Sequence, residues 1–215
     1  MKKIINYEGN QYIVEYYNDW ILEQVEKNNT FFEIQLLEQL RNKVSDFSHT
    51  IDIGGNIGNH SFYFTNICGA KKITAFEPIK SNANLFKINN PLAKLYNVAL
   101  SDFEGSCDMF NPNPWNEGTY KMGSSSNFKT YPQIEVKIFD NFNLKDISFV
   151  KIDVEGEEVK VLKGMKNTLS SNLPQLCVEI HKHLGVNLHE VLEVLPKGYT
   201  HEYLGEDHYL FTPLK

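Results

Sequence analysis

The sequence has little of three features that mark particular classes of protein. Its three cysteines, Cys68, Cys107 and Cys177, are scattered without the paired spacing of a zinc site, so we expect reduced thiols in a cytoplasmic protein. It has no block of lysine and arginine, and its net charge of −6 argues against a nucleic-acid-binding surface. No run approaches the ~18 apolar residues of a membrane span, so none is expected.

The remaining composition is that of an ordinary globular protein. Hydrophobic residues make up 41% of the 215 residues and charged residues 22%, which is enough to form a substantial core. The length suits one domain. We expect residues 1–45 to form an N-terminal extension with a helix, and residues 46–215 to form a single globular unit.

Apolar segments and helical patterns alternate along most of the chain. Expected helices lie at 30–43, 58–67, 81–90, 157–170 and 187–195, and expected strands at 11–16, 50–54, 72–76, 95–100, 133–139, 149–154, 176–180, 199–204 and 208–211. Thr30 and Glu33 have capping-box spacing, and Ser81 is the expected cap of its helix. Residues 105–133 are rich in turn-forming residues and predict a long loop. The alternation predicts an open α/β sheet that ends in an antiparallel hairpin.

The segment TIDIGGNIGNH at 50–60 joins an apolar strand to a glycine-rich turn. Glu77 follows the next apolar run, at the spacing of a βαβ unit whose acid binds a ribose. A dinucleotide fingerprint would need glycine where Asn56 and Asn59 stand, so the turn suits a cofactor without a pyrophosphate, such as S-adenosylmethionine, rather than NAD. Such turns also occur without a ligand. The cofactor-binding residues expected here are Asp52, Gly54, Asn56, Gly58 and Glu77.

A second group of polar residues follows the strand expected at 149–154. Asp153 and Glu155 stand at its carboxyl end, where sites form in sheets of this kind. We expect them to face the reactive end of the cofactor and to orient a substrate hydroxyl. Glu157 and Glu158 more simply complement the dipole of the helix that begins there. His181 ends the next strand and is another candidate general base, although a solvated loop histidine fits its position equally well.

Two further residues close the strand expected at 95–100. Ser101 and Asp102 are candidate cofactor-binding residues, because Asp102 could accept a hydrogen bond from an adenine amino group. It could equally begin a turn. The sequence contains no metal signature, and its acids could bind a cation only if the fold gathers them.

Three candidates for contact with the substrate are less specific. His60 begins a helix beside the glycine turn, where it could contact a ligand or simply pack. Trp115 and Tyr120 lie in the expected loop and could line a substrate-binding lid, since long loops in compact domains are often functional. Alternatively, they form a small apolar cluster beneath that loop.

Taken together, the motifs resemble the FkbM family of methyltransferases. The matching segments, in family order, are DIGGNIGNH (52–60), FEP (76–78), NVALSD (97–102), KIDVEGEE (151–158), VLKG (161–164) and VE (178–179). Gly55 stands where the family usually has alanine. The resemblance implies the Rossmann-like class I fold, with a seven-stranded, mostly parallel sheet. It also implies an S-adenosylmethionine-dependent O-methyltransferase acting on a hydroxyl of a saccharide or small molecule.

Two other functions remain open at this point. N-methylation of another acceptor fits less well, because amino-methylating enzymes often show an Asn/Asp-Pro-Pro-aromatic motif where this chain has Asp-Val-Glu-Gly. The other is a non-catalytic S-adenosylmethionine-binding module, and the acids at 153 and 155 argue against it. An alcohol must lose a proton as it attacks, and these residues could accept it.

Overall fold

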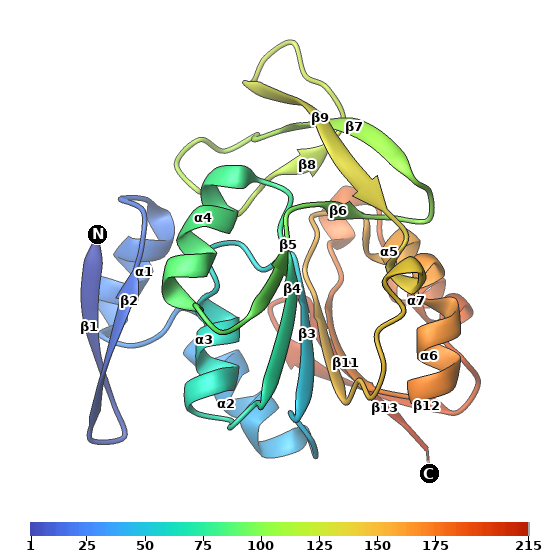
Figure 1. Ribbon diagram of the computed structural model, residues 1–215, viewed down its shortest axis with the longest axis horizontal. Helices are drawn as coiled ribbons and strands as arrows, with labels where there is room; N and C mark the ends of the chain where they lie inside the picture. Colours follow the sequence, from blue (N-terminus) through green and yellow to red (C-terminus); the bar gives the residue numbers. More distant parts are fainter. Residues whose placement is uncertain (215) are drawn as a thin grey trace.

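A seven-stranded sheet organises the computed structural model, which describes residues 1–214 (Figure 1). The strands lie in the order β12-β13-β11-β10-β3-β4-β5. Their bounds are β3 His49–Ile53, β4 Lys72–Phe76, β5 Lys94–Tyr96, β10 Phe149–Ile152, β11 Gln175–Glu179, β12 Tyr199–Gly205 and β13 His208–Pro213. Neighbours from β5 to β11 are parallel, whereas β13 runs antiparallel to β11 and β12. The expected fold, a mostly parallel sheet with a C-terminal antiparallel hairpin, is confirmed.

Helices cover both faces of this sheet (Figure 1). Their bounds are α1 Trp20–Asn28, α2 Ile34–Lys43, α3 Asn59–Asn66, α4 Lys80–Asn89, α5 Glu158–Gly164, α6 Lys166–Asn172 and α7 Leu188–Val194. One apolar cluster joins α1–α4 to the sheet and a second joins α5–α7 to its other face. Every residue of β3 and β10 is therefore buried. Strands buried on both faces appear in a sequence as continuous apolar runs, which is why both were recognisable.

The N-terminal residues pack against the helices of the domain. The hairpin of β1 (Lys2–Tyr7) and β2 (Asn10–Glu15) lies beside α4, where the Asn89 side chain bonds both backbone groups of Glu15. Helix α1 was not anticipated. It begins after Asp19, whose Oδ1 accepts a hydrogen bond from the N–H of Leu22 at 3.2 Å. Among residues 1–214, no helix combines the length and apolar character needed to cross a membrane.

Two of the predicted helix caps are wrong. Thr30 does not cap α2, because its hydroxyl bonds no group in the described part of the chain and the Glu33 side chain faces His60 instead. Ser81 lies inside α4, which begins one residue earlier with Ile79 at the cap position. The helix expected at 157–170 divides at Met165 into α5 and α6.

The loop expected at 105–133 contains strands of a second sheet above the carboxyl ends of the main strands (Figure 1). Its order is β6-β9-β7-β8, with bounds β6 Ala99–Leu100, β7 Gly105–Phe110, β8 Lys121–Met122 and β9 Thr130–Lys137. The strand expected at 95–100 divides between the two sheets, as β5 and β6. Most residues of β7 and β9 are exposed or half-buried, so their composition resembles that of a loop.

Candidate active site

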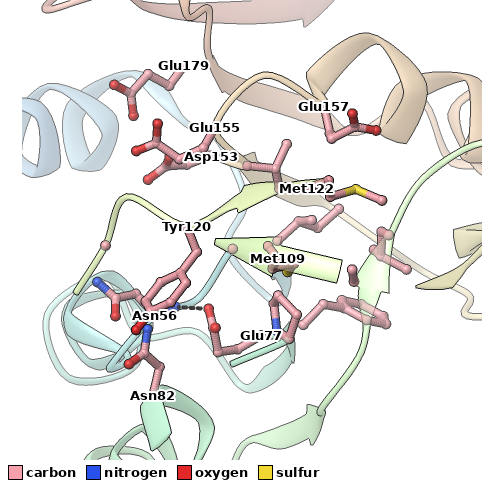
Figure 2. Close-up of a pocket in the computed structure, with 18 of the residues that line it drawn as sticks. Asn56, Glu77, Asn82, Met109, Tyr120, Met122, Asp153, Glu155, Glu157 and Glu179 are labelled. Atoms are coloured by element: carbon pink, nitrogen blue, oxygen red, sulfur yellow. Dashed lines mark hydrogen bonds between the residues drawn. The ribbon is translucent and has the colours of Figure 1, made fainter. Parts of the chain in front are cut away.

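A pocket of about 280 Å³ opens between the carboxyl ends of the main strands and the second sheet. Open α/β sheets bind ligands at this edge. Figure 2 shows the pocket, whose labelled residues are Asn56, Glu77, Asn82, Met109, Tyr120, Met122, Asp153, Glu155, Glu157 and Glu179. The turn after β3 and the ends of β4, β10 and β11 supply much of the polar part, and the apolar lining comes from the N-terminal segment, the strand ends and the second sheet.

The glycine turn brings two strand ends into direct contact. Gly54 has φ +78° and its N–H donates to the carbonyl oxygen of Phe76 at 3.0 Å. A Cβ at Gly54 would overlap the carbonyl oxygen of Asp153 and lie 2.9 Å from its carbonyl carbon. Only glycine fits this backbone and this spacing. The end of β3 thus lies against the end of β10, and Gly54 and Asp153 both line the pocket.

Glu77 is a buried carboxylate held by backbone donors. Its two oxygens accept hydrogen bonds from the N–H groups of Asn56 and Ile79, each at 2.8 Å (Figure 2 shows the first). Burial raises the pKa of Glu77 to about 7, and the carboxylates of Asp52 and Asp153 add to the increase. The bonds fix the carboxylate in the pocket wall, in position to accept hydrogen bonds from a ligand.

Three carboxylates, those of Asp153, Glu155 and Glu179, gather at the opposite end of the pocket (Figure 2). Lys151 is buried and its Nζ lies 2.8 Å from Asp153 Oδ2; although burial alone would raise the pKa of Asp153, this ammonium lowers it. Among residues 1–214, no lysine forms an ion pair with Glu155 within 4 Å, and burial followed by repulsion from Asp153 raises the pKa of Glu155 to about 7. Burial and the same repulsion raise the pKa of Glu179.

His181 lies buried behind these carboxylates rather than in solvent. Its Nδ1 is 2.6 Å from Glu158 Oε1, and its Nε2 is 3.4 Å from Glu179 Oε1 and 3.6 Å from Glu155 Oε2. Burial lowers the pKa of His181, but the hydrogen bond to Glu158 and the negative charges of Asp153, Glu158 and Glu155 together outweigh it, and the net shift is upward. Glu158 is fully buried and also accepts from the N–H of Gly156, so it is not merely a helix-end charge. The imidazole is therefore held in one orientation, with Nε2 toward the cluster.

Two predicted cofactor-binding residues support the glycine turn without lining the pocket. Asp52 is fully buried and its Oδ2 accepts a hydrogen bond from Ser61 Oγ at 2.6 Å, while Oδ1 has no hydrogen-bond partner in residues 1–214. Gly58 begins α3 at φ +84°, where a Cβ would overlap the Asn90 side chain. Both residues fix the course of the chain from β3 into α3.

Three other predicted residues also lie outside the pocket lining. Ser101 is buried and its Oγ lies 3.1 Å from Glu157 Oε2, whereas Asp102 is exposed at the surface. His60 is buried with its Nε2 3.0 Å from Glu33 Oε2, and it is Glu33 that borders the pocket. The structure thus brings Ser101 and His60 next to pocket residues and leaves Asp102 apart.

The two aromatic residues of the expected lid occupy different places. Tyr120 is buried, lines the pocket, and donates its hydroxyl hydrogen to Glu117 at 2.5 Å. Trp115 is 50% exposed and does not line the pocket, although its carbonyl oxygen accepts from the N–H of Trp20. Trp20 does line it.

Sequence reasoning predicted no cofactor or substrate contact for several residues of the pocket wall: Trp20, Glu33, Asn82, Glu157 and Glu179. Glu179 ends β11 directly, so the rule that sites form at the ends of strands could have identified it. Trp20 and Glu33 reach the pocket from the N-terminal segment by packing, for which the sequence carries no comparable signal.

Comparison with known proteins identifies relatives for most of the chain. The sequence model of the methyltransferase FkbM domain matches residues 52–203. Hexuronic acid methyltransferase AglP of Haloferax volcanii is 31% identical over 153 residues, which cover 68% of this chain and 61% of that protein. Methyltransferase 1 of Beauveria bassiana is 25% identical over 162 residues, which cover 63% and 65%. The chain therefore spans less than two thirds of these relatives.

Solved structures agree on the fold. A methyltransferase FkbM from Methylobacillus flagellatus has a TM-score of 0.51 at 15% identity, covering 90% of this chain and 60% of its own. A TehB-like S-adenosylmethionine-dependent methyltransferase from Corynebacterium glutamicum has a TM-score of 0.52 at 10% identity, covering 90% and 94%. At these identities the likeness concerns the Rossmann-like architecture alone.

Proposed function

Because the chain belongs to the FkbM methyltransferase family, we propose that this S-adenosylmethionine-dependent methyltransferase acts on a hydroxyl group of a saccharide. The observation that carries the proposal is the cluster of Asp153, Glu155 and Glu179 at one end of the pocket. A hydroxyl must lose its proton as it attacks, and carboxylates in the pocket wall can accept it. The name of the Haloferax relative, a hexuronic acid methyltransferase, supports a saccharide acceptor.

The cofactor end of the pocket is assigned to the glycine turn and Glu77. Gly54 leaves room where a Cβ would clash, and the buried Oδ1 of Asn56 has no hydrogen-bond partner among the described residues. Glu77 would accept hydrogen bonds from ribose hydroxyls. Asp52 and Gly58 shape the turn, and Ser101 and Asp102 follow β6, whose Leu100 lines the pocket. When bound, S-adenosylmethionine supplies an electrophilic methyl group.

The acceptor end is assigned to Asp153 and Glu155, with His181 as the second candidate base. An acceptor hydroxyl held here would pass its proton to the base as its oxygen took the methyl group that S-adenosylmethionine would supply. Of the two carboxylates, Glu155 is the better candidate for the base, because the carboxylate of Asp153 is already bonded to the ammonium group of Lys151. Tyr120 in the pocket wall and Trp115 near its rim are the proposed acceptor contacts, and His60 positions Glu33.

Incubation with isotopically labelled S-adenosylmethionine and a panel of acceptors tests the function. We expect label in saccharides that carry uronic acids or free hydroxyls, with the methyl group on oxygen when the product is fragmented in a mass spectrometer. Amine-bearing peptides and nucleic acids serve as comparison acceptors. Label found only on nitrogen, with none on a saccharide, would contradict the proposal.

Replacing Glu77 by alanine is expected to weaken cofactor binding while the protein stays folded. The loss of hydrogen bonds to a charged acceptor should cost roughly 1.5–3 kcal/mol, which is about ten- to 150-fold in Kd. Isothermal titration calorimetry measures the Kd of S-adenosylmethionine for the wild type and the variant. NAD is the control ligand and should not bind. Tight NAD binding without a response to S-adenosylmethionine would overturn the assignment.

The same residue makes cofactor affinity depend on pH. Since the pKa of Glu77 is raised to about 7, its carboxylate is mostly protonated at pH 6, and affinity should rise about tenfold between pH 6 and pH 8. Glu77→Ala should lose this dependence. The free energy of unfolding changes with pH in the opposite direction to the cofactor affinity. The contribution from the raised pKa of Glu77 is fully present below pH 4.5 and is lost as the pH rises through 7.

A further inference from the structure

We propose that Asp153, Glu179 and His181 bind one divalent cation at the acidic end of the pocket. Each residue offers one ligand atom, and these atoms lie within 4.8 Å of one another. Cations that bind oxygen at about 2.0–2.6 Å can hold ligand atoms up to roughly 4–5 Å apart. The three ligand atoms can therefore share one ion. Asp153 follows β10, while Glu179 ends and His181 follows its parallel neighbour β11.

The orientation of His181 is the first argument beyond proximity. Fully buried Glu158 takes the Nδ1 side of the ring at 2.6 Å, and this leaves Nε2 directed at Glu179 and Glu155. Metal-bound histidines characteristically have a carboxylate behind the ring, because it fixes the tautomer and strengthens the ligand nitrogen. The pair of Glu158 and His181 supplies that arrangement.

An unpartnered buried nitrogen on the next strand is an independent observation. His208 of β13 pairs with Glu179 in the sheet and is 2% exposed. Within the part of the chain that the structure describes, its Nε2 has no hydrogen-bond partner, and it lies 3.5 Å from Glu179 Oε2. A buried polar atom without a partner is costly, and here it is directed toward the same carboxylate.

The charge around the cluster also favours a bound cation. Four carboxylates border this end of the pocket, those of Glu33, Asp153, Glu155 and Glu179. Lys151 bonds one oxygen of Asp153 at 2.8 Å and carries a single positive charge. Burying several carboxylates is unfavourable unless they are paired or coordinate a metal. A divalent ion would offset the negative charge that Lys151 does not neutralise.

The donor set indicates the kind of cation. Two carboxylates and one imidazole suit Mn²⁺ or Zn²⁺ better than Ca²⁺, which prefers oxygen ligands alone. The role of the ion, unlike the site, rests on the proposed function. An acceptor hydroxyl bound to the ion would lose its proton more easily, with Glu155 beside it to accept that proton.

Mn²⁺ binding to the full chain, without cofactor or acceptor, tests the site. We expect calorimetry and electron paramagnetic resonance to find one equivalent of bound Mn²⁺, with Zn²⁺ competing for it. Asp153→Asn and Glu179→Gln should each weaken binding by at least about tenfold, and Glu158→Gln by about 10- to 100-fold through the orientation of His181. His189→Gln is the matched control, because His189 and Glu193 form an exposed histidine–carboxylate pair 3.2 Å apart.

The outcomes separate the site from its role. A folded wild-type protein that takes up neither Mn²⁺ nor Zn²⁺ overturns the proposal, and so does a folded Glu179→Gln variant that binds as the wild type does. Circular dichroism and thermal melting establish folding. Full methyl transfer after removal of metal by a chelator would overturn the role in proton removal, with no bearing on whether the protein is a methyltransferase.

Discussion

Replacing Glu155 by glutamine is expected to slow methyl transfer by roughly 10²- to 10⁴-fold, the range for loss of a general base. The carboxylate borders the pocket beside Asp153 and is free of the lysine that holds its neighbour. Glutamine keeps the shape of the side chain and cannot accept the proton in the same way. Single-turnover methylation measures the chemical step, and calorimetry should show that S-adenosylmethionine still binds.

Companion variants decide which side chain is the base. Glu135→Gln removes an exposed carboxylate on β9 and should leave turnover unchanged. Asp153→Asn should reduce turnover through loss of orientation. If Glu155→Gln and Asp153→Asn both retain nearly full turnover, the carboxylate assignment fails. Loss of activity in His181→Ala alone would then move the base to the end of β11, provided that the variant, which leaves Glu158 unpaired, remains folded.

The sheet and half of the pocket could be predicted because their signals are local. Strands β3 and β10 are buried on both faces, so each gives an uninterrupted apolar run, and the polar residue after each run marks the edge where sites form. This reasoning placed Glu77, Asp153 and Glu155 at the strand ends as site residues, and all three line the pocket. It placed four more residues there that do not line the pocket: Asp52, Ser101, Asp102 and His181. For these residues, the distances and hydrogen-bond partners came from the structure.

The second sheet and the pairing of distant side chains could not be predicted in the same way. Strands β7 and β9 have one largely exposed face and a register shift between Cys107 and Met109, so no regular alternation marks them. The contact of His181 with Glu158 joins residues 23 positions apart on different elements. Such contacts depend on how α5 packs against the sheet, which residue types alone do not specify.

Replacing Gly54 by alanine should destabilise the protein far more than the same change at Gly69. Both glycines have a positive φ of similar size, +78° and +72°. An alanine in this left-handed region costs about 1–2 kcal/mol at either position. At Gly69 nothing lies within 4 Å of the added Cβ, whereas at Gly54 the Cβ overlaps the carbonyl oxygen of Asp153.

The difference between the two variants therefore isolates the clash between strand ends. Their effects on the unfolded chain are alike and cancel. Overpacking against fixed backbone should add about 1–3 kcal/mol or more to the loss in Gly54→Ala, measured as the free energy of unfolding in urea. Relief of the clash must move β3 away from β10, so the gap between Gly54 and Asp153 widens and S-adenosylmethionine affinity should fall in Gly54→Ala alone. Equal losses of stability in the two variants would mean that the contact adds nothing beyond the backbone conformation of Gly54. A selective loss would show that the turn is glycine because both the pocket and the sheet need the same close approach.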